Sequence, residues 1–335
     1  MTHEFIKILD RYHYYKNKNE KTVLASVVAL NGSSYRSVGV RMLISESGEI
    51  TGAISAGCIE KNILKESAVV FSNGCARMFQ YDGRLRLGCE GMLHILIEPL
   101  QLPVATLTIL KTCLKKRFYF NIVSQYHLAQ ETHNCLGSYI AYDDKKFKLH
   151  ERLRLKSVAK KYSQEIPPVF RLIIIGDEYD AFKLATCAEN IGWQVTIVVK
   201  RITEGLDKNI EATDTILIQE EQLAFGDFDE RTALVLMTHN YARDLYFLER
   251  LEPVNVCYFG ILGPAKRKER LYYDLMEKWP EKDFLFFNTL YAPVGLDIGA
   301  ETPEEIAIAI VAEILTVIRD KKPIMLKNKT EAIHS

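Results

Sequence analysis

Two patterns of hydrophobic and polar positions divide the chain near residue 165. Before it, short apolar runs separated by glycine turns accompany a few helical repeats, which indicates an α+β domain. After it, apolar runs of strand length alternate with amphipathic helical segments, which is typical of a doubly wound parallel sheet. We therefore predict an α/β protein with an N-terminal α+β domain at 1–165, a Rossmann-like domain at 169–322 and a basic tail at 323–335.

The first domain is predicted to begin with a helix over 3–16, where apolar residues recur at helical spacing. A second helix follows Cys58 and ends at Asn73-Gly74, and a third covers 104–117. The remaining apolar runs predict strands at 22–30, 41–44, 49–55, 76–81, 92–98, 118–124 and 138–142. Residues 143–164 are rich in Lys and Arg without a clear apolar pattern, so we predict a solvated approach to a linker there.

The second domain shows strand patterns that alternate with helices. Strands are expected at 169–175, 194–199, 215–218, 233–237 and 254–259, with helices at 179–191 and 242–251 and a final helix capped by Thr302. Ligands of such sheets bind at the carboxyl ends of the strands. His239 follows one strand, and Gly260 and Gly263 follow another. His239 is equally compatible with a binding site and with a helix cap or an ordinary loop histidine.

The turn at Gly176 departs from the pattern of a dinucleotide-binding turn. Gly176 and Ala181 match the first and third positions of G-x-G-x-x-G/A, but Glu178 stands where the second glycine belongs. A carboxylate at the start of the helix would repel a phosphate. Lys200 and Arg201 replace the acid expected to bind a ribose. NAD(P) is therefore possible but disfavoured, and an NAD(P)-dependent oxidoreductase remains an alternative.

Composition excludes several classes of protein. Lys plus Arg and Asp plus Glu both number 43, so no global field favours nucleic acid or an anionic membrane. No apolar run approaches the roughly 20 residues of a membrane helix, and the charged N-terminus does not resemble a secretory signal. A cytoplasmic location is expected. The seven cysteines are scattered without a C-x-x-C pair, which favours neither a disulfide framework nor a zinc knuckle.

The stretch from residue 31 to 60 combines small residues, two arginines and a cysteine. Arg36 and Arg41 could pair with an anion, and Ser55 and Gly57 offer a hydroxyl and close backbone approach just before Cys58. The alternative is a glycine-punctuated hairpin with a buried cysteine.

A second glycine-flanked cysteine, Cys89, lies in the sequence RLGCEG. Buried structural cysteines favour the middle of apolar runs, and neither Cys58 nor Cys89 lies in one. If the strands that flank them are neighbours, the two thiols could face one site.

Several motifs together resemble the XdhC/CoxI family, the accessory factors of xanthine dehydrogenase and related molybdenum hydroxylases. They are GSSYRSVGVRML, GCIE at Cys58, LGCEG at Cys89, VLMTHN, YFGILGPAKRK and PVGLDIGAETPEEIAIAI, the last of which contains Asp297.

The resemblance implies a cofactor maturation protein and leaves open whether it is also an enzyme. It would bind the molybdenum cofactor, hold it during sulfuration and deliver it to an apo-hydroxylase, with a cysteine desulfurase as a further partner and a homodimer as the assembly. A scaffold without ligand binding is the remaining alternative. The residues that we expect to contact the cofactor, with Cys58 as the metal ligand, are Cys58, Cys89, Arg36, Arg41, Ser55, Gly57, His239, Gly260, Gly263 and Asp297.

Overall fold

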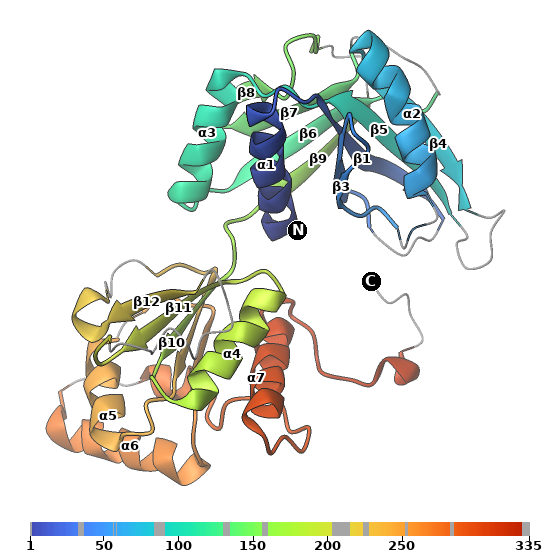
Figure 1. Cartoon of the computed structure of the whole chain (residues 1–335). Helices are drawn as coiled ribbons and strands as arrows, with labels where there is room; N and C mark the ends of the chain where they lie inside the picture. The colour runs from blue at the N-terminus through green and yellow to red at the C-terminus, as the bar shows by residue number, and fades with distance from the viewer. Residues whose placement is uncertain are drawn as a thin grey trace. The chain divides into compact units, whose positions relative to one another are not determined.

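The chain divides into two compact units, Met1–Val169 and Phe170–Ser335, each of which is described by itself (Figure 1). The computed structural model describes residues 2–32, 37–55, 57, 59–83, 91–129, 135–155, 160–202, 215–223, 228–251, 254–281 and 285–329. Among the helices in these ranges, none has both the length and the apolar character needed to span a bilayer.

The N-terminal unit is built on an antiparallel sheet with the strand order β3-β2-β1-β5-β4. Its strands are β1 (Thr22–Asn31), β2 (Arg41–Ser45), β3 (Ile50–Gly52), β4 (Arg77–Asp82) and β5 (Met92–Pro99). Because both faces of this sheet are covered, its central strands are buried along nearly their whole length.

Helix α2 (Glu60–Asn73) packs on one face of this sheet through Ile63 and Val70. The opposite face contacts α1 (Thr2–Asn17), α3 (Val104–Lys115) and a second antiparallel sheet, β8-β7-β6-β9. The strands of the second sheet are β6 (Phe120–Tyr126), β7 (Gly137–Tyr142), β8 (Lys145–Lys148) and β9 (Lys160–Ile166). Figure 1 shows α2 apart from α1 and α3, which lie together.

The prediction of a solvated linker over 143–164 is wrong. This segment supplies β8 and β9, which pair with β7 and β6. In β9 the lysines at its start are exposed, whereas Gln164 and Ile166 are buried. The charged residues lie at the start and on the outer face of an edge strand. They outnumber the few buried residues, so the segment shows no apolar pattern from which a strand could be predicted.

A buried polar cluster joins the two sheets. The Glu98 carboxylate of β5 accepts hydrogen bonds from the Ser138 hydroxyl (2.5 Å) and backbone N–H (2.7 Å) of β7. His150 Nε2 lies 3.7 Å from Glu98 Oε2. A Cβ atom on Gly137, whose φ is +142°, would lie 2.7 Å from His150 Nε2, so this strand can approach the cluster only because residue 137 is glycine.

Burial shifts the two titratable groups of this cluster in opposite directions. It raises the pKa of Glu98 to about 7, although the Ser138 hydrogen bonds and the Arg41 charge act against it. It lowers the pKa of His150 to about 4, helped by the nearby cations Lys148 and Arg152. Both groups therefore favour their neutral forms in the folded protein at mildly acidic pH.

These shifts predict opposite pH dependences of stability. The folded state holds the extra proton on Glu98 between about pH 4.5 and 7, so this carboxyl makes stability fall as pH rises through that window. The unfolded state holds the extra proton on His150 between about pH 4 and 6.5, so this imidazole makes stability rise. The two contributions oppose each other where the windows overlap.

Glu98→Gln should therefore leave the His150 contribution unopposed. The difference in unfolding free energy, variant minus wild type, should increase by at most about 1.4 kcal/mol per pH unit between pH 5 and 6.5, measured by urea denaturation. In His150→Gln the same difference should decrease with pH. A pH-independent difference in both variants would contradict the opposed titrations.

The C-terminal unit is a parallel sheet with the strand order β12-β11-β10-β13-β14, which confirms the predicted Rossmann-like architecture. Its strands are β10 (Arg171–Ile175), β11 (Gln194–Val199), β12 (Ile216–Gln219), β13 (Thr232–Leu236) and β14 (Tyr258–Ile261). Strand β14 begins later than the expected 254–259, because only residues 258–261 pair with β13.

Helices cover both faces of this sheet (Figure 1). On one face lie α4 (Tyr179–Asn190) and α7 (Pro303–Ile318), and on the other α5 (Tyr241–Arg250) and α6 (Ala265–Lys278). Short 3₁₀ helices occur at Glu220–Gln222, Leu285–Thr289 and Leu326–Asn328. The expected cap of α7 is confirmed, since the Thr302 hydroxyl accepts from Glu305 N while the Glu305 carboxylate accepts from Thr302 N.

Candidate functional site

The register of the first sheet gathers several loop connections at one end. Asn31, the last residue of β1, pairs with Met92, the first residue of β5, and Met92 pairs with Asp82, the last residue of β4. Beyond that pair, Gly83 N donates to Gly91 O at 2.9 Å. The described residues next to Arg36 and Cys89 in the sequence therefore meet at this end of the sheet.

The chain also reaches Cys58 from this end. Strand β3 is antiparallel to β2 and ends with Gly52 paired to Met42, beside the start of β2. The β2 strand starts at the end of the sheet where β1 finishes, as the antiparallel pairing of the two requires. Arg36, Cys58 and Cys89 themselves lie outside the described residues.

A hydrogen-bonded clamp holds the segment from Ser55 to Glu60. The Glu60 carboxylate accepts from Ser55 N (2.7 Å), from the Ser55 hydroxyl (2.9 Å) and from Ile59 N (3.2 Å). Between them, Gly57 has a φ of +105°, and a Cβ atom added there would meet no atom within 4 Å. Glu60 thus closes the segment that contains Cys58, and the backbone at Gly57 borders open space.

The clamp keeps Glu60 ionised. Burial acts to raise the pKa of this carboxyl, but the hydrogen bonds from Ser55 and Ile59 outweigh it and hold the pKa below its ordinary value. A carboxylate that accepts several N–H and O–H groups has much of its charge compensated locally. This interaction restrains the segment and does not depend on a ligand.

The clamp predicts a specific loss of stability. Glu60→Ala should lower the free energy of unfolding by about 2 kcal/mol, because it leaves the donors of Ser55 and Ile59 without their acceptor. Lys61→Ala changes an exposed side chain in the same helical turn and should cost less than about 0.5 kcal/mol. Urea denaturation of both variants at pH 7 measures the difference, and equal losses would show that Glu60 is only a surface residue.

Arg41 lies apart from this segment, in the interior between the two sheets. Its side chain is 8% exposed and donates to Gly39 O and to Gln164 Oε1 of β9. Burial lowers its pKa to about 10, against the effect of Tyr162 and Glu98, so it remains charged at neutral pH. The structure therefore gives Arg41 interior contacts rather than the surface position expected of an anion ligand.

In the C-terminal unit, strand order reverses between β10 and β13, where doubly wound sheets bind ligands. Gly176 follows β10 and Met237 follows β13. A Cβ atom on Gly176 would collide with the Met237 carbonyl, so the glycine is needed for the close approach of the two strand ends. The first glycine of the nucleotide-type turn therefore has a structural role that requires no ligand.

An ion-pair network occupies the turn after Gly176. Arg243 of α5 donates to Asp177 Oδ1 at 3.0 Å and, from Nε and Nη2, to Glu220 Oε1 at 2.9 and 2.5 Å. Glu178, the residue expected to repel a phosphate, is exposed and makes no capping hydrogen bond to α4. The carboxylate that is fixed in this turn is that of Asp177.

His239 also lies at this switch point. It has a φ of +51°, its side chain is 47% exposed, and its Nε2 lies 3.3 Å from Asp180 Oδ2 at the start of α4. The neighbouring residue Asn240 caps α5 by accepting from Arg243 N at 3.1 Å. His239 is therefore a partly exposed loop residue with a carboxylate partner. It is not the cap of α5, because Asn240 has that role.

Gly263 and Asp297 are brought together, since both line a cavity of about 390 Å³ beside the N-terminal half of α7. Gly260 lies within β14 rather than after it, contrary to expectation. A Cβ atom there would lie 2.6 Å from Val294 Cγ2, and Val294 lines the same cavity. His239 is not among the residues that line it.

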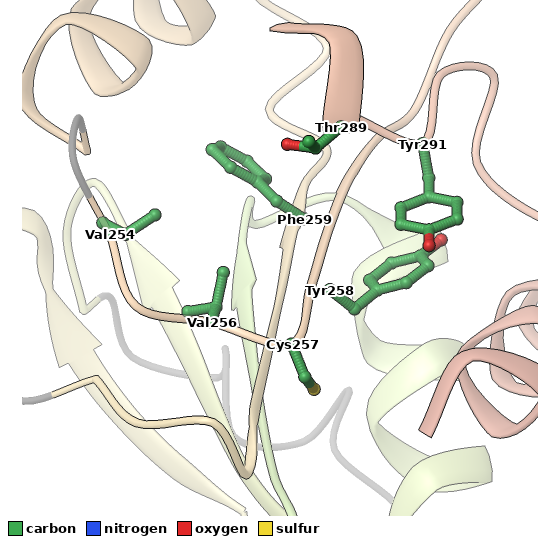
Figure 2. Close-up of a pocket in the computed structure, with 7 residues that line it drawn as sticks. All are labelled: Val254, Val256, Cys257, Tyr258, Phe259, Thr289 and Tyr291. Atoms are coloured by element: carbon green, nitrogen blue, oxygen red, sulfur yellow. The ribbon is translucent and has the colours of Figure 1, made fainter. Parts of the chain in front are cut away.

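A second cavity, of about 200 Å³, lies at the amino end of β14 (Figure 2). Figure 2 shows the rings of Tyr258 and Tyr291 face to face and the Cys257 thiol directed away from them. The centroids of the two rings are 4.3 Å apart. Burial raises the pKa of Cys257 to about 11, and its Sγ lies 3.2 Å from Thr232 O. This cavity is at the wrong end of the sheet for a typical ligand site, and its thiol is held protonated.

The described part of the chain holds no group of three or more His, Cys, Asp or Glu side chains arranged to bind a metal. Burial also raises the pKa of the thiols of Cys113 and Cys187. Sequence reasoning missed Tyr241, Arg243 and Asp244, whose contacts with Asp274, Glu220, Asp177 and Arg267 span between 23 and 66 residues. No local motif signals such contacts.

Comparisons with known proteins cover both units. The XdhC Rossmann domain model matches residues 172–314, and the XdhC and CoxI family model matches residues 16–82. The chain is similar to a probable xanthine dehydrogenase subunit of Bacillus subtilis, with 29% identity over 326 residues that cover 88% of this chain and 93% of the relative. It is 21% identical over 301 residues to the molybdenum cofactor insertion chaperone PaoD of Escherichia coli, covering 88% and 83% of the two chains.

Among solved structures, a xanthine dehydrogenase from Bacillus halodurans has a TM-score of 0.76 and 25% sequence identity, covering 94% of this chain and 97% of the other. The fold similarity thus extends over nearly the whole length of both chains. With both of its units matched and its relatives aligned along most of its length, the chain belongs to the XdhC and CoxI family.

Proposed function

We propose that this protein is a maturation factor that binds the molybdenum cofactor and delivers it, in sulfurated form, to the apo form of a xanthine dehydrogenase-type hydroxylase. The observation that carries the proposal is the common end of the first sheet from which the chain leads to Arg36, Cys58 and Cys89. The names of the Bacillus subtilis relative and of the Escherichia coli chaperone support the same class of function.

The residues at this end suit such a cofactor. Thiolates are soft donors that suit molybdenum or sulfur transfer, and Arg36 can pair with a phosphate in a bidentate manner. The open space above Gly57 admits a ligand close to the backbone, and the Glu60 clamp restrains the segment that contains Cys58. When bound, the cofactor supplies the molybdenum centre that the target hydroxylase needs.

Each residue has a distinct task in this proposal. Cys58 provides the ligating sulfur and Cys89 the second thiol of the site. Ser55 and Gly57 shape the backbone next to Cys58, and Arg36 binds the anionic end of the ligand. Arg41 is left out, because its guanidinium is engaged between the sheets.

The finer points of the proposal come from the family resemblance. They are a cytoplasmic site of action, a cysteine desulfurase that provides the sulfur, and a homodimer as the assembly. In the C-terminal unit, Gly263 and Asp297 line one cavity and Gly260 lies against Val294 of its wall, and we assign a ligand-handling role to this cavity as well. His239 contributes separately, at the switch point of the sheet.

The central test is the pterin content of protein isolated from cells that make molybdenum cofactor. Cys58→Ala should reduce the bound pterin, measured by the fluorescence of its oxidised form, at least about tenfold, because the ligating sulfur is lost. Cys75→Ala, a partly exposed cysteine that follows α2, is the matched control and should retain the pterin. No pterin in the wild type, together with full hydroxylase activation by Cys58→Ala, would refute the proposal.

Two further measurements separate the alternatives. Titration with NADH and NADPH should show no binding at millimolar concentration, since Arg243, Asp177 and Glu220 occupy the turn where a pyrophosphate would lie. Saturable binding would favour an oxidoreductase. If a Cys58, Cys89 double variant still binds the hydroxylase and activates it, the protein is a scaffold and not a cofactor carrier.

A further inference from the structure

A second pocket in the C-terminal unit has a different character from the cavity at Asp297. It measures about 410 Å³ and is lined by Tyr241, Lys266, Arg267 and Arg270. Tyr241 is the first residue of α5, and the three cations lie in the first two turns of α6. Both helices start at the carboxyl ends of their strands, β13 and β14, which is the edge where doubly wound sheets bind ligands.

One cation of the pocket is fixed by a buried carboxylate. Arg267 donates from Nε (2.9 Å) and Nη2 (2.6 Å) to Asp244 Oδ2, and Asp244 is 1% exposed. The other oxygen of Asp244 accepts from the Thr238 hydroxyl at 2.5 Å. Two donations to one carboxylate oxygen restrain the guanidinium, so Arg267 forms a rigid wall whose charge is already balanced.

The other two cations have no carboxylate partner among the described residues. Lys266 and Arg270 are exposed and stand four residues apart, on the same face of α6. The Arg270 guanidinium lies over the Tyr241 ring, with its central carbon 4.7 Å from the ring centroid. The nearby Asp274 carboxylate accepts a hydrogen bond from the Tyr241 hydroxyl at 2.6 Å. The pocket therefore carries the positive charges of Lys266 and Arg270, because Asp244 pairs with Arg267 and Asp274 bonds to Tyr241.

Two other features favour an anion here. The first turn of α6 contains no acidic residue, and Pro264 provides no side-chain cap, so the positive end of the helix is uncompensated. Tyr241 is a fixed platform, because burial and the Asp274 hydrogen bond raise the pKa of its phenol to about 12 and keep it neutral.

We propose that this pocket binds a phosphate-bearing small molecule, a phosphomonoester or a diphosphate, through Lys266 and Arg270. An ammonium and a guanidinium that converge on a compact cavity match a tetrahedral oxyanion with several acceptor oxygens. The volume accommodates one or two phosphate groups with part of the attached molecule, whereas an acidic peptide needs an extended row of cations. The inference does not depend on the role of Cys58.

The test is calorimetric titration of the full chain with inorganic pyrophosphate at low ionic strength. Lys266→Gln combined with Arg270→Gln should weaken binding at least about tenfold, since two charge-assisted contacts are lost. The matched control is Lys111→Gln with Lys115→Gln, two cations four residues apart on the exposed face of α3, with the same change in net charge. It should change the affinity less than about twofold.

Three outcomes would overturn the proposal. One is equal weakening in the pocket variant and the control, which would show non-specific attraction to positive charge. Another is the absence of saturable pyrophosphate binding to the wild type at millimolar concentration. Displacement of pyrophosphate by a hexaglutamate peptide that binds more tightly would also overturn it, in favour of an acidic protein partner. Circular dichroism and thermal melting of each variant verify that the chain is folded.

Two added measurements identify the source of the phosphate once pyrophosphate binds as expected. If the pocket variant also loses bound pterin from cells that make molybdenum cofactor, the phosphate belongs to that cofactor. If the pterin is retained and ADP competes with pyrophosphate, the ligand is a nucleotide phosphate. Both results support the pocket, and neither alters the outcome of the Cys58 test.

Discussion

The pairing of β1 with β5 is the constraint on which the N-terminal unit depends. Its register fixes which residues of β1 face α2 and which face the second sheet, and both sets are buried. A slip by one residue would exchange the two faces and place the Glu98 carboxylate among apolar side chains of the α2 layer. The same register determines that Asn31, Asp82 and Met92 meet at one end of the sheet.

The interior of the N-terminal unit also contains buried ionisable groups, which lower its stability. Glu98, His150 and Arg41 are all nearly excluded from solvent, and Arg41 Nε and Nη2 have no hydrogen-bond partner among the described residues. Buried ionisable groups lower stability unless they are well paired, although they can define a single packing arrangement. The two hydrogen bonds from Ser138 to Glu98 favour one packing arrangement of the two sheets, because they form only when β7 lies in one position against β5.

Sequence reasoning predicted the elements that have strong periodicity or strong caps. The parallel sheet, the Thr302 cap and the family motifs were readable because each depends on residues close together in the chain. The second sheet was missed at β8 and β9, where exposed lysines mask the half-buried end of β8 and the buried face of β9. The contacts of Arg41 and Arg243 could not be predicted, since their partners are up to 123 residues away and no local pattern encodes them.

The first turn of α5 holds three side chains that bond to four residues elsewhere in the chain. Tyr241 bonds to Asp274, Arg243 to Asp177 and Glu220, and Asp244 to Arg267. Successive residues of a helix point about 100° apart, so a shift of α5 by one residue would break all of these contacts together. The turn from 237 to 240 therefore has a fixed length, and an insertion or deletion there would disrupt the switch point and the basic pocket at the same time.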